Sequence, residues 1–201
     1  MTEFQQVKEF ILNKLKKELP GYLAYHNIDH TLDVLQAAEN IAVHEGVNGN
    51  DKRLLLTAAL FHDSGFLIGR DEHEVKSCSI ARLHLPDYSY GPDEIDLICG
   101  LIMATKLPQT PHNLLQAILC DADLDYLGRA DFFILSARLF TELKDEGLMK
   151  DENEWNLEQT NFISNHHYHT PTSVRLRQSQ KEQYIELIKS KISNQIFDGD
   201  A

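Results

Sequence analysis

The sequence predicts an all-α fold. Apolar residues recur at helical spacing along most of the chain, as in the first segment, where Val7, Ile11 and Leu15 fall on one face. Turn residues separate these stretches, and Pro20 with Gly21 ends the first one. No stretch alternates apolar and polar residues as a strand does, and no glycine-rich phosphate loop is found.

The expected helices follow one another with short turns between them. Asn27 is expected to cap the second helix. The third contains the run LLLTAALF, which is rich in Leu and Ala and therefore favours buried helix over strand. Pro92 and Pro111 are expected in the first turns of the fifth and sixth helices. The expected ranges are 2–19, 27–46, 51–63, 72–85, 92–105, 111–127, 131–146, 152–165 and 173–196.

Length and charge limit the classes of protein to consider. A chain of 201 residues is expected to bury one core, so a single domain over residues 1–201 is predicted. The net charge of -12 disfavours a nucleic-acid polymer as partner, because the phosphate backbone would be repelled. A small phosphate compound is still compatible with this charge if a cation lies beside it.

The three cysteines give no metal or disulfide pattern. Cys78, Cys99 and Cys120 lie within apolar stretches and lack CxxC spacing, so reduced, buried thiols are expected. No signal-peptide pattern and no apolar run of membrane-spanning length is found. A cytoplasmic protein without a membrane partner is therefore expected.

Histidines and aspartates interrupt three of the apolar stretches. His26 and His30 are four residues apart, which places them on one helix face if the turn at His26 is helical; a partly exposed pair beside a loop is the alternative. His62 and Asp63 directly follow LLLTAALF, where polar groups are costly to bury without a partner. Metal ligation is the favoured interpretation of this doublet, and helix capping by Asp63 is the alternative.

A third polar interruption is formed by Asp121, Asp123 and Asp125 in ILCDADLDYLG. Residues two apart on a helix diverge by about 200°, so the three carboxylates cannot face one point. One is expected in a buried site, one bonded to neighbouring groups and one in solvent. Imidazole and carboxylate ligands together suit a borderline or hard divalent cation.

In order, these motifs resemble the HD superfamily of metal-dependent phosphohydrolases, an all-α fold named for its His-Asp doublet. The resemblance covers about residues 22–130 and extends more weakly to about residue 188. It implies an HD core over 22–130 with additional C-terminal helices over 131–196. It also implies that the metal ligands are His30, His62, Asp63 and Asp123.

Two branches of the superfamily share further motifs with this chain. The pattern YHNxxH followed by the doublet and Ala-Asp-Leu is similar to the cyclic-nucleotide phosphodiesterase branch, which implies that His26 protonates the leaving oxygen. The pattern HExxS, which begins at His73, resembles small bacterial HD phosphohydrolases. Ala104 stands where some branches have a histidine for a second metal, so a full two-metal ligand set is not expected. The purine clamp of the large phosphodiesterases is not identifiable.

The resemblance implies a phosphodiesterase or phosphomonoesterase that acts on a nucleotide or another small phosphate ester through a metal-activated water, with His26 and Asp63 as catalytic residues. The ligand set does not distinguish Mn, Mg, Fe, Co and Zn. The alternatives are a non-catalytic regulatory HD module that binds a nucleotide or a protein partner, and an HD-type oxygenase with two irons, which would need more histidine ligands.

The remaining candidates are assigned to substrate binding. They comprise His73, Lys106, Arg129, His166 and Tyr168, and for Lys106 and Arg129 a solvated surface charge is the alternative. His167 and His169 are expected at the surface. The apolar residues of the last helix are expected to serve packing or the contact of a homo-oligomer.

Overall fold

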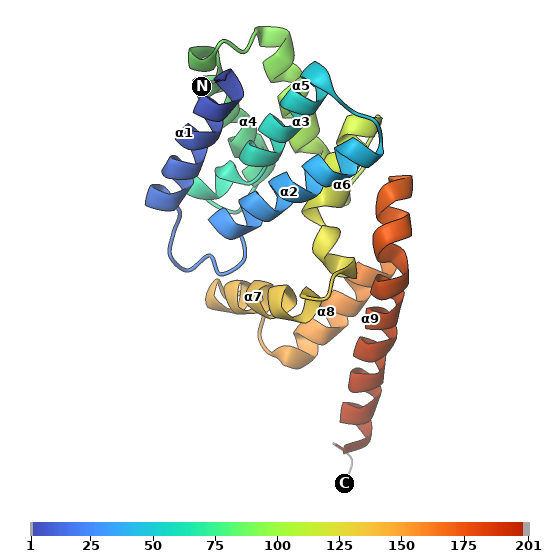
Figure 1. Ribbon diagram of the computed structural model, residues 1–201. Helices are drawn as coiled ribbons and strands as arrows, with labels where there is room; N and C mark the ends of the chain where they lie inside the picture. The colour runs from blue at the N-terminus through green and yellow to red at the C-terminus, as the bar shows by residue number, and fades with distance from the viewer. Residues whose placement is uncertain (1, 199–201) are drawn as a thin grey trace. The chain divides into compact units, whose positions relative to one another are not determined.

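The computed structural model describes residues 2–198, with side chains up to residue 190, and confirms the all-α class: the described part contains helices and no strand (Figure 1). The chain divides into two compact units, Met1–Leu124 and Asp125–Ala201. Each is described by itself, and the single domain over 1–201 stays a prediction. No helix in the described range is long and apolar enough to cross a membrane.

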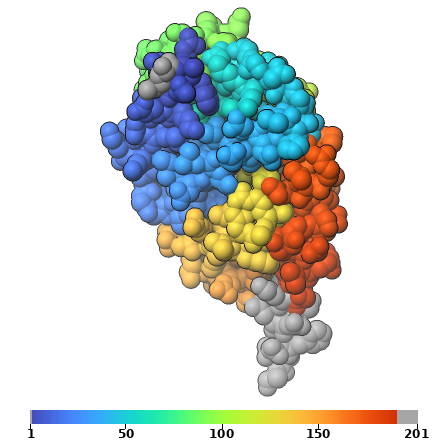
Figure 2. Space-filling view, in the orientation of Figure 1, coloured from blue at the N-terminus to red at the C-terminus, as the bar shows by residue number. Residues whose placement is uncertain are grey.

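The first unit holds six α-helices and two short 3-10 helices within its described residues. They are α1 (Glu3–Glu18), α2 (Ile28–His44), α3 (Gly49–Phe61), η1 (Ser64–Leu67), α4 (His73–His84), η2 (Leu85–Tyr88), α5 (Pro92–Ala104) and α6 (Leu114–Asp123). In the space-filling view, atoms of α1 and α2 cover much of the face of this unit that is turned to the viewer (Figure 2).

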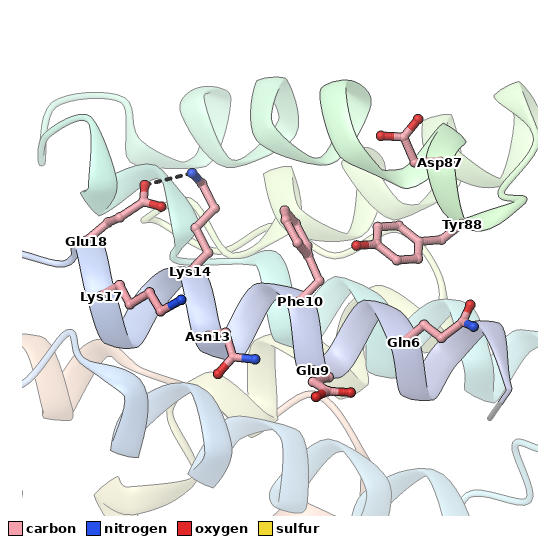
Figure 3. A pocket seen from close by; sticks show the side chains of 9 residues that line it. All are labelled: Gln6, Glu9, Phe10, Asn13, Lys14, Lys17, Glu18, Asp87 and Tyr88. Carbon is pink, nitrogen blue, oxygen red and sulfur yellow. Dashed lines mark hydrogen bonds and ion pairs between the residues drawn. The ribbon is translucent and has the colours of Figure 1, made fainter.

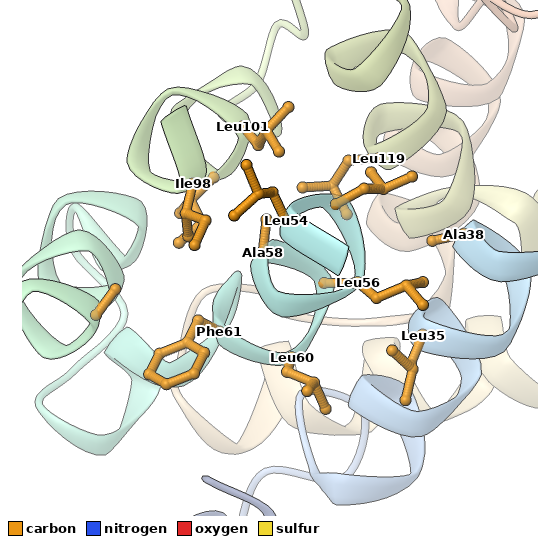
Figure 4. Close-up of a cluster of buried hydrophobic side chains, with 14 of the residues drawn as sticks. Leu35, Ala38, Leu54, Leu56, Ala58, Leu60, Phe61, Ile98, Leu101 and Leu119 are labelled. Atoms are coloured by element: carbon orange, nitrogen blue, oxygen red, sulfur yellow. The ribbon is translucent and has the colours of Figure 1, made fainter. Parts of the chain in front are cut away.

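Helix α3 is the centre of the first unit. Every residue from Leu54 to Phe61 is buried, and α1, α2, α5 and α6 all pack against this helix. A helix that is apolar on all sides is stable only when it is surrounded by other helices. Figure 4 shows Ile98 and Leu101 of α5 and Leu119 of α6 next to Leu54 and Ala58. The C-terminal end of α3 is therefore buried inside the first unit, and so are the polar residues that follow it.

Local capping explains where several helices begin. The Asn27 side chain accepts hydrogen bonds from the backbone N–H groups of Asp29 and His30, which confirms it as the cap of α2. Pro92 is in the first turn of α5, as predicted. Pro111 is not in a helix, which corrects the predicted start of α6: Asn113 is the cap and accepts a hydrogen bond from Gln116. The sixth helix also ends early, at Asp123.

The second unit begins with a short 3-10 helix and continues with three helices. They are η3 (Asp125–Gly128), α7 (Phe132–Asp145), α8 (Glu152–Asn165) and α9 (Pro171–Asp198). The Phe132 ring stacks on Tyr184 of α9 at a centroid distance of 4.8 Å, and α9 also packs against η3 and α8. Tyr184 and Ile188 are buried, whereas Leu187 is 49% exposed, so the predicted packing role holds for the first two.

Candidate metal centre

The His-Asp doublet lies where the central helix ends. Phe61 is the last residue of α3 and His62 follows it as the C-cap, with 1% of its surface exposed. Its Nδ1 donates a hydrogen bond to the carbonyl oxygen of Ala59 at 2.9 Å. A ring that is protonated at Nδ1 presents the lone pair of Nε2 to whatever lies on its other side.

The imidazole of His30 lies on that other side. His30 is in the first turn of α2, which the Asn27 cap holds in place, and its Nε2 is 3.3 Å from Nε2 of His62. Both histidines are buried. Two neutral acceptor nitrogens would repel each other at this distance, so a proton or a cation is needed between them.

Two carboxylates complete the cluster. Asp63 Oδ2 lies 3.3 Å from Nε2 of His30 and 3.2 Å from Nε2 of His62. Asp123 Oδ1, from the last residue of α6, lies 3.3 and 3.4 Å from the same two nitrogens. The Asp63 side chain makes no capping hydrogen bond to η1, so the capping alternative for Asp63 is wrong.

The donor set fits a divalent cation. Ligand atoms at about 2.0–2.1 Å from a tetrahedral metal are roughly 3.3–3.4 Å apart, which matches the separations within this cluster. Asp63 Oδ2 is buried without a hydrogen-bond partner, although it is close to both imidazoles. Such an atom is costly to bury unless a charge compensates it. His30, His62 and Asp123 also satisfy the spacing of a metal-binding group by themselves.

The pKa shifts of the metal-free cluster arise from the same short distances between imidazoles and carboxylates. Burial alone lowers the pKa of His30, but the close Asp123 and Asp63 carboxylates outweigh it and raise the pKa to about 9. The pKa of His62 is raised well above its usual value, since Asp63 and Asp123 again outweigh burial. Burial raises the pKa of Asp123, but the two imidazoles outweigh this effect and bring it to about 2. Opposite charges therefore stabilise each other where no cation is bound.

His26 and His73 flank this cluster. Helix α2 begins at Ile28, so His26 lies before it and not on its face, which corrects the conditional expectation of a shared helix face. The rings of His26 and His30 nevertheless lie 5.8 Å apart between centroids. His73, the first residue of α4, has Nε2 at 3.4 Å from Asp63 Oδ1 and at 3.5 Å from Glu74 Oε1. The two oxygens of Asp63 thus face different histidines.

Sequence reasoning missed the residues that hold the doublet in place. Ser77 of α4 donates to the carbonyl oxygen of His62 at 2.6 Å and accepts from the N–H of Gly65 at 2.7 Å. A Cβ atom on Gly65 would be 1.9 Å from the carbonyl oxygen of His73, so only glycine permits this approach. The HExxS pattern contains Ser77, but nothing in it indicates a contact with residue 62.

The three alternating aspartates are distributed differently from the prediction. Asp123 joins the metal cluster, and Asp125 accepts two hydrogen bonds from the guanidinium of Arg177, at 2.7 and 3.1 Å. Asp121 is fully buried, so the expectation that one of the three is solvated is wrong. Asp123 and Asp125, two residues apart, therefore have different partners.

The substrate-binding candidates are divided between the two units. Lys106 is exposed in the loop after α5. Arg129, His166 and Tyr168 belong to the second unit, where Arg129 donates to Asp131 and the ring of His166 packs on Tyr168 at 4.7 Å. His167 and His169 are exposed, as predicted. Within the first unit, Nε2 of His73 lies 3.4 Å from Oδ1 of Asp63, a member of the cluster.

A groove of about 620 Å³ lies along α1 and η2 but contains none of the candidate residues (Figure 3). Phe10 and Tyr88 form its aromatic part, and Lys14 is paired with Glu18 at 2.7 Å. Three carboxylates face two lysines there, so its charge does not favour a phosphate.

The residues of this cluster lie within a stretch that matches a known family. Residues 27–125 match the family described as HD domain. An uncharacterized protein of Clostridium beijerinckii is 34% identical over 76 residues, which cover 36% of this chain and 48% of that protein. The match therefore spans about half the length of this relative.

Two solved structures share the fold at low identity. A predicted HD superfamily hydrolase from an uncultured Thermotogales bacterium has a TM-score of 0.62 at 19% identity, covering 92% of this chain and 91% of that chain. A protein from Lactobacillus plantarum has a TM-score of 0.68 at 18% identity, covering 96% of this chain and 97% of that chain. With its doublet at the end of α3 and its distal carboxylate at the end of α6, both inside the matched residues, this chain belongs to the HD superfamily.

Proposed function

We propose that this protein is a metal-dependent phosphohydrolase, a phosphodiesterase or phosphomonoesterase, that acts on a nucleotide or another small phosphate ester. The observation that carries the proposal is the convergence of His30, His62, Asp63 and Asp123, with a buried oxygen of Asp63 that has no hydrogen-bond partner. These four side chains would hold the cation. When bound, a divalent cation acts as a Lewis acid toward a phosphoryl oxygen and lowers the pKa of a ligated water.

Side chains of this protein would protonate the leaving group, orient the attacking water and bind the substrate. Water attacks phosphorus and releases one proton to solvent, the bond from phosphorus to the leaving oxygen breaks, and His26 gives its proton to that oxygen. An imidazole is suited to this transfer because its pKa is near neutral pH. Asp63 orients the attacking water, and His73, 3.4 Å from Asp63 Oδ1, binds the substrate beside it.

The first test is turnover by protein loaded with Mn, Mg, Co or Ni, assayed against nucleotides, cyclic nucleotides and simple phosphate esters. Asp63→Ala is expected to abolish turnover and leave the protein folded. Asp51→Ala removes an exposed carboxylate at the start of α3, the helix that the doublet follows; it is the matched control and is expected to retain activity. An Asp63→Ala protein as active as the wild type would contradict the assignment.

The second test concerns His26. His26→Gln is expected to slow substrates with poor leaving groups by about 100-fold or more and those with good leaving groups far less. Equal slowing of both would remove His26 as the acid. Binding of metal and nucleotide without any turnover would instead support a regulatory HD module.

A further inference from the structure

The phenyl ring of Phe66 packs against two imidazoles, whose own ring centroids lie 6.4 Å apart. It stacks on His26 with a centroid distance of 4.3 Å and an interplanar angle of 18°. On another side it packs against His73 at 4.5 Å and 33°. The three residues come from the loop before α2, from η1 and from the first position of α4.

Phe66 is attached firmly to the doublet. Its N–H donates to the carbonyl oxygen of Asp63 at 3.1 Å, and only 2% of its surface is exposed. It lies in η1, which follows the doublet directly. The backbone of Phe66 is therefore bonded to that of Asp63, and its ring is enclosed by neighbouring side chains.

Both imidazoles also have other contacts. Nδ1 of His73 bonds to the carbonyl oxygen of Arg70 at 3.2 Å, and its Nε2 lies 3.4 Å from Oδ1 of Asp63. His26 is half-buried in a loop outside α2, and its ring stacks on Phe66 and makes an edge contact with Tyr25 at 4.9 Å and 82°. Stacked and edge-to-face contacts restrict how an aromatic ring turns about its last side-chain bond.

We propose that Phe66 is a positioning residue, which fixes the plane of the His26 imidazole beside the metal centre. The inference rests on the proposed function insofar as His26 is the proton donor, but the contact itself can be tested without turnover. Misplacement of a reacting group by about 1 Å is enough to slow a reaction about 100-fold. A leucine at position 66 keeps apolar volume but offers no face for the imidazole.

The first experiment is NMR of the metal-free protein with labelled histidine. A ring at 4.3 Å shifts the carbon-bound protons of His26 upfield, and Phe66→Leu is expected to remove this shift. The matched control is Phe10→Leu, because Phe10 also packs on an imidazole, that of His84 at 4.7 Å, in the same unit. It is expected to change the His84 signals and leave those of His26 unchanged. Absence of the upfield shift in the wild type would overturn the proposal.

The second experiment is a double-mutant cycle with the metal-loaded protein. Phe66→Leu is expected to lower kcat about 10- to 100-fold for a poor leaving group, with little change in KM and much less effect on a good leaving group. In the His26→Gln background it is expected to have no further effect, because the two residues act as a unit. Phe66→Tyr, which retains the ring, is expected to retain both the NMR shift and the leaving-group dependence. If Phe66→Leu does not fold, the upfield shift of His26 in the wild-type protein remains the deciding measurement.

The outcomes separate this inference from the proposed function. If Phe66→Leu slows the His26→Gln protein as much as the wild type, Phe66 does not act through His26 and the inference fails while the hydrolase assignment stands. If the upfield shift is present and no phosphate ester is hydrolysed with any metal, the contact is supported and the proposed function fails.

Discussion

The Nε2 atoms of His30 and His62 lie 3.3 Å apart, although the residues are 32 positions apart in the chain. Helices α2 and α3 bring them together, and the carboxylates of Asp63 and Asp123 lie at similar distances from both nitrogens. The cluster places two carboxylates against two imidazoles inside the first unit. Its properties can be tested separately from any assay of turnover.

Metal binding is expected to stabilise the protein. A cation at 100 times its dissociation constant adds about 2.7 kcal/mol to the free energy of unfolding, provided that it does not bind the unfolded chain. Asp123→Asn is expected to abolish most of this gain, whereas Asp87→Asn, an exposed aspartate of η2, is expected to retain it. Denaturant titrations with Mn or Mg and with a chelator measure the difference. Equal gains in the two variants would exclude Asp123 as a ligand.

The metal-free protein is expected to lose stability as the pH rises above neutrality. The pKa of His30 is about 9 in the folded state against 6.5 for the free side chain, so its contribution is complete below pH 6.5 and lost between pH 6.5 and 9. The pKa of Asp123 is about 2 against 3.8, so its contribution is lost only as the pH falls through that range. Unfolding midpoints in chelator at pH 6 and 9 measure the effect. His30→Gln is expected to reduce the loss of stability between pH 6 and 9. An unchanged dependence of stability on pH would show that His30 is not its cause.

Ser77→Ala is expected to destabilise the fold by about 1–3 kcal/mol, because it leaves the N–H of Gly65 and the carbonyl of His62 without their buried partner. Ser79→Ala is the matched control. Ser79 is exposed on the same helix, and its hydroxyl donates to the carbonyl oxygen of Val75 within α4. Its effect is expected to stay within about 0.5 kcal/mol. Equal losses in the two variants, measured by urea denaturation, would argue against the role given to Ser77.

Gly65→Ala is expected to cost about 1–3 kcal/mol or more, since the new Cβ would lie 1.9 Å from the carbonyl oxygen of His73 and one of the two segments must move. Gly21→Ala serves as the control, because a Cβ there meets nothing within 4 Å. Calorimetry of both proteins provides the comparison. A Gly65→Ala protein that melts at the wild-type temperature would show that η1 and α4 are not held as closely as described.

Much of the local structure was predictable from the sequence. The helical periodicity of α1, the Asn27 cap of α2 and the apolar run of α3 are local patterns, and each element formed where its pattern predicted. The start of α6 was predicted wrongly because Pro111 and Asn113 are both acceptable at a helix start, and the Asn113 side chain bonds to Gln116. When two residues that favour a helix start lie within three positions of each other, the sequence does not determine which of them begins the helix.

The order of His30, the doublet and Asp123 along the chain resembles the HD superfamily, and this resemblance was enough to predict an all-α fold with these side chains as metal ligands. Tertiary structure alone decided that His26 lies beside His30, that Ser77 holds the doublet, and that Phe66 stacks on His26. The physical reason is range: periodicity and capping act over a few residues, whereas these contacts join segments whose approach depends on how helices pack around α3.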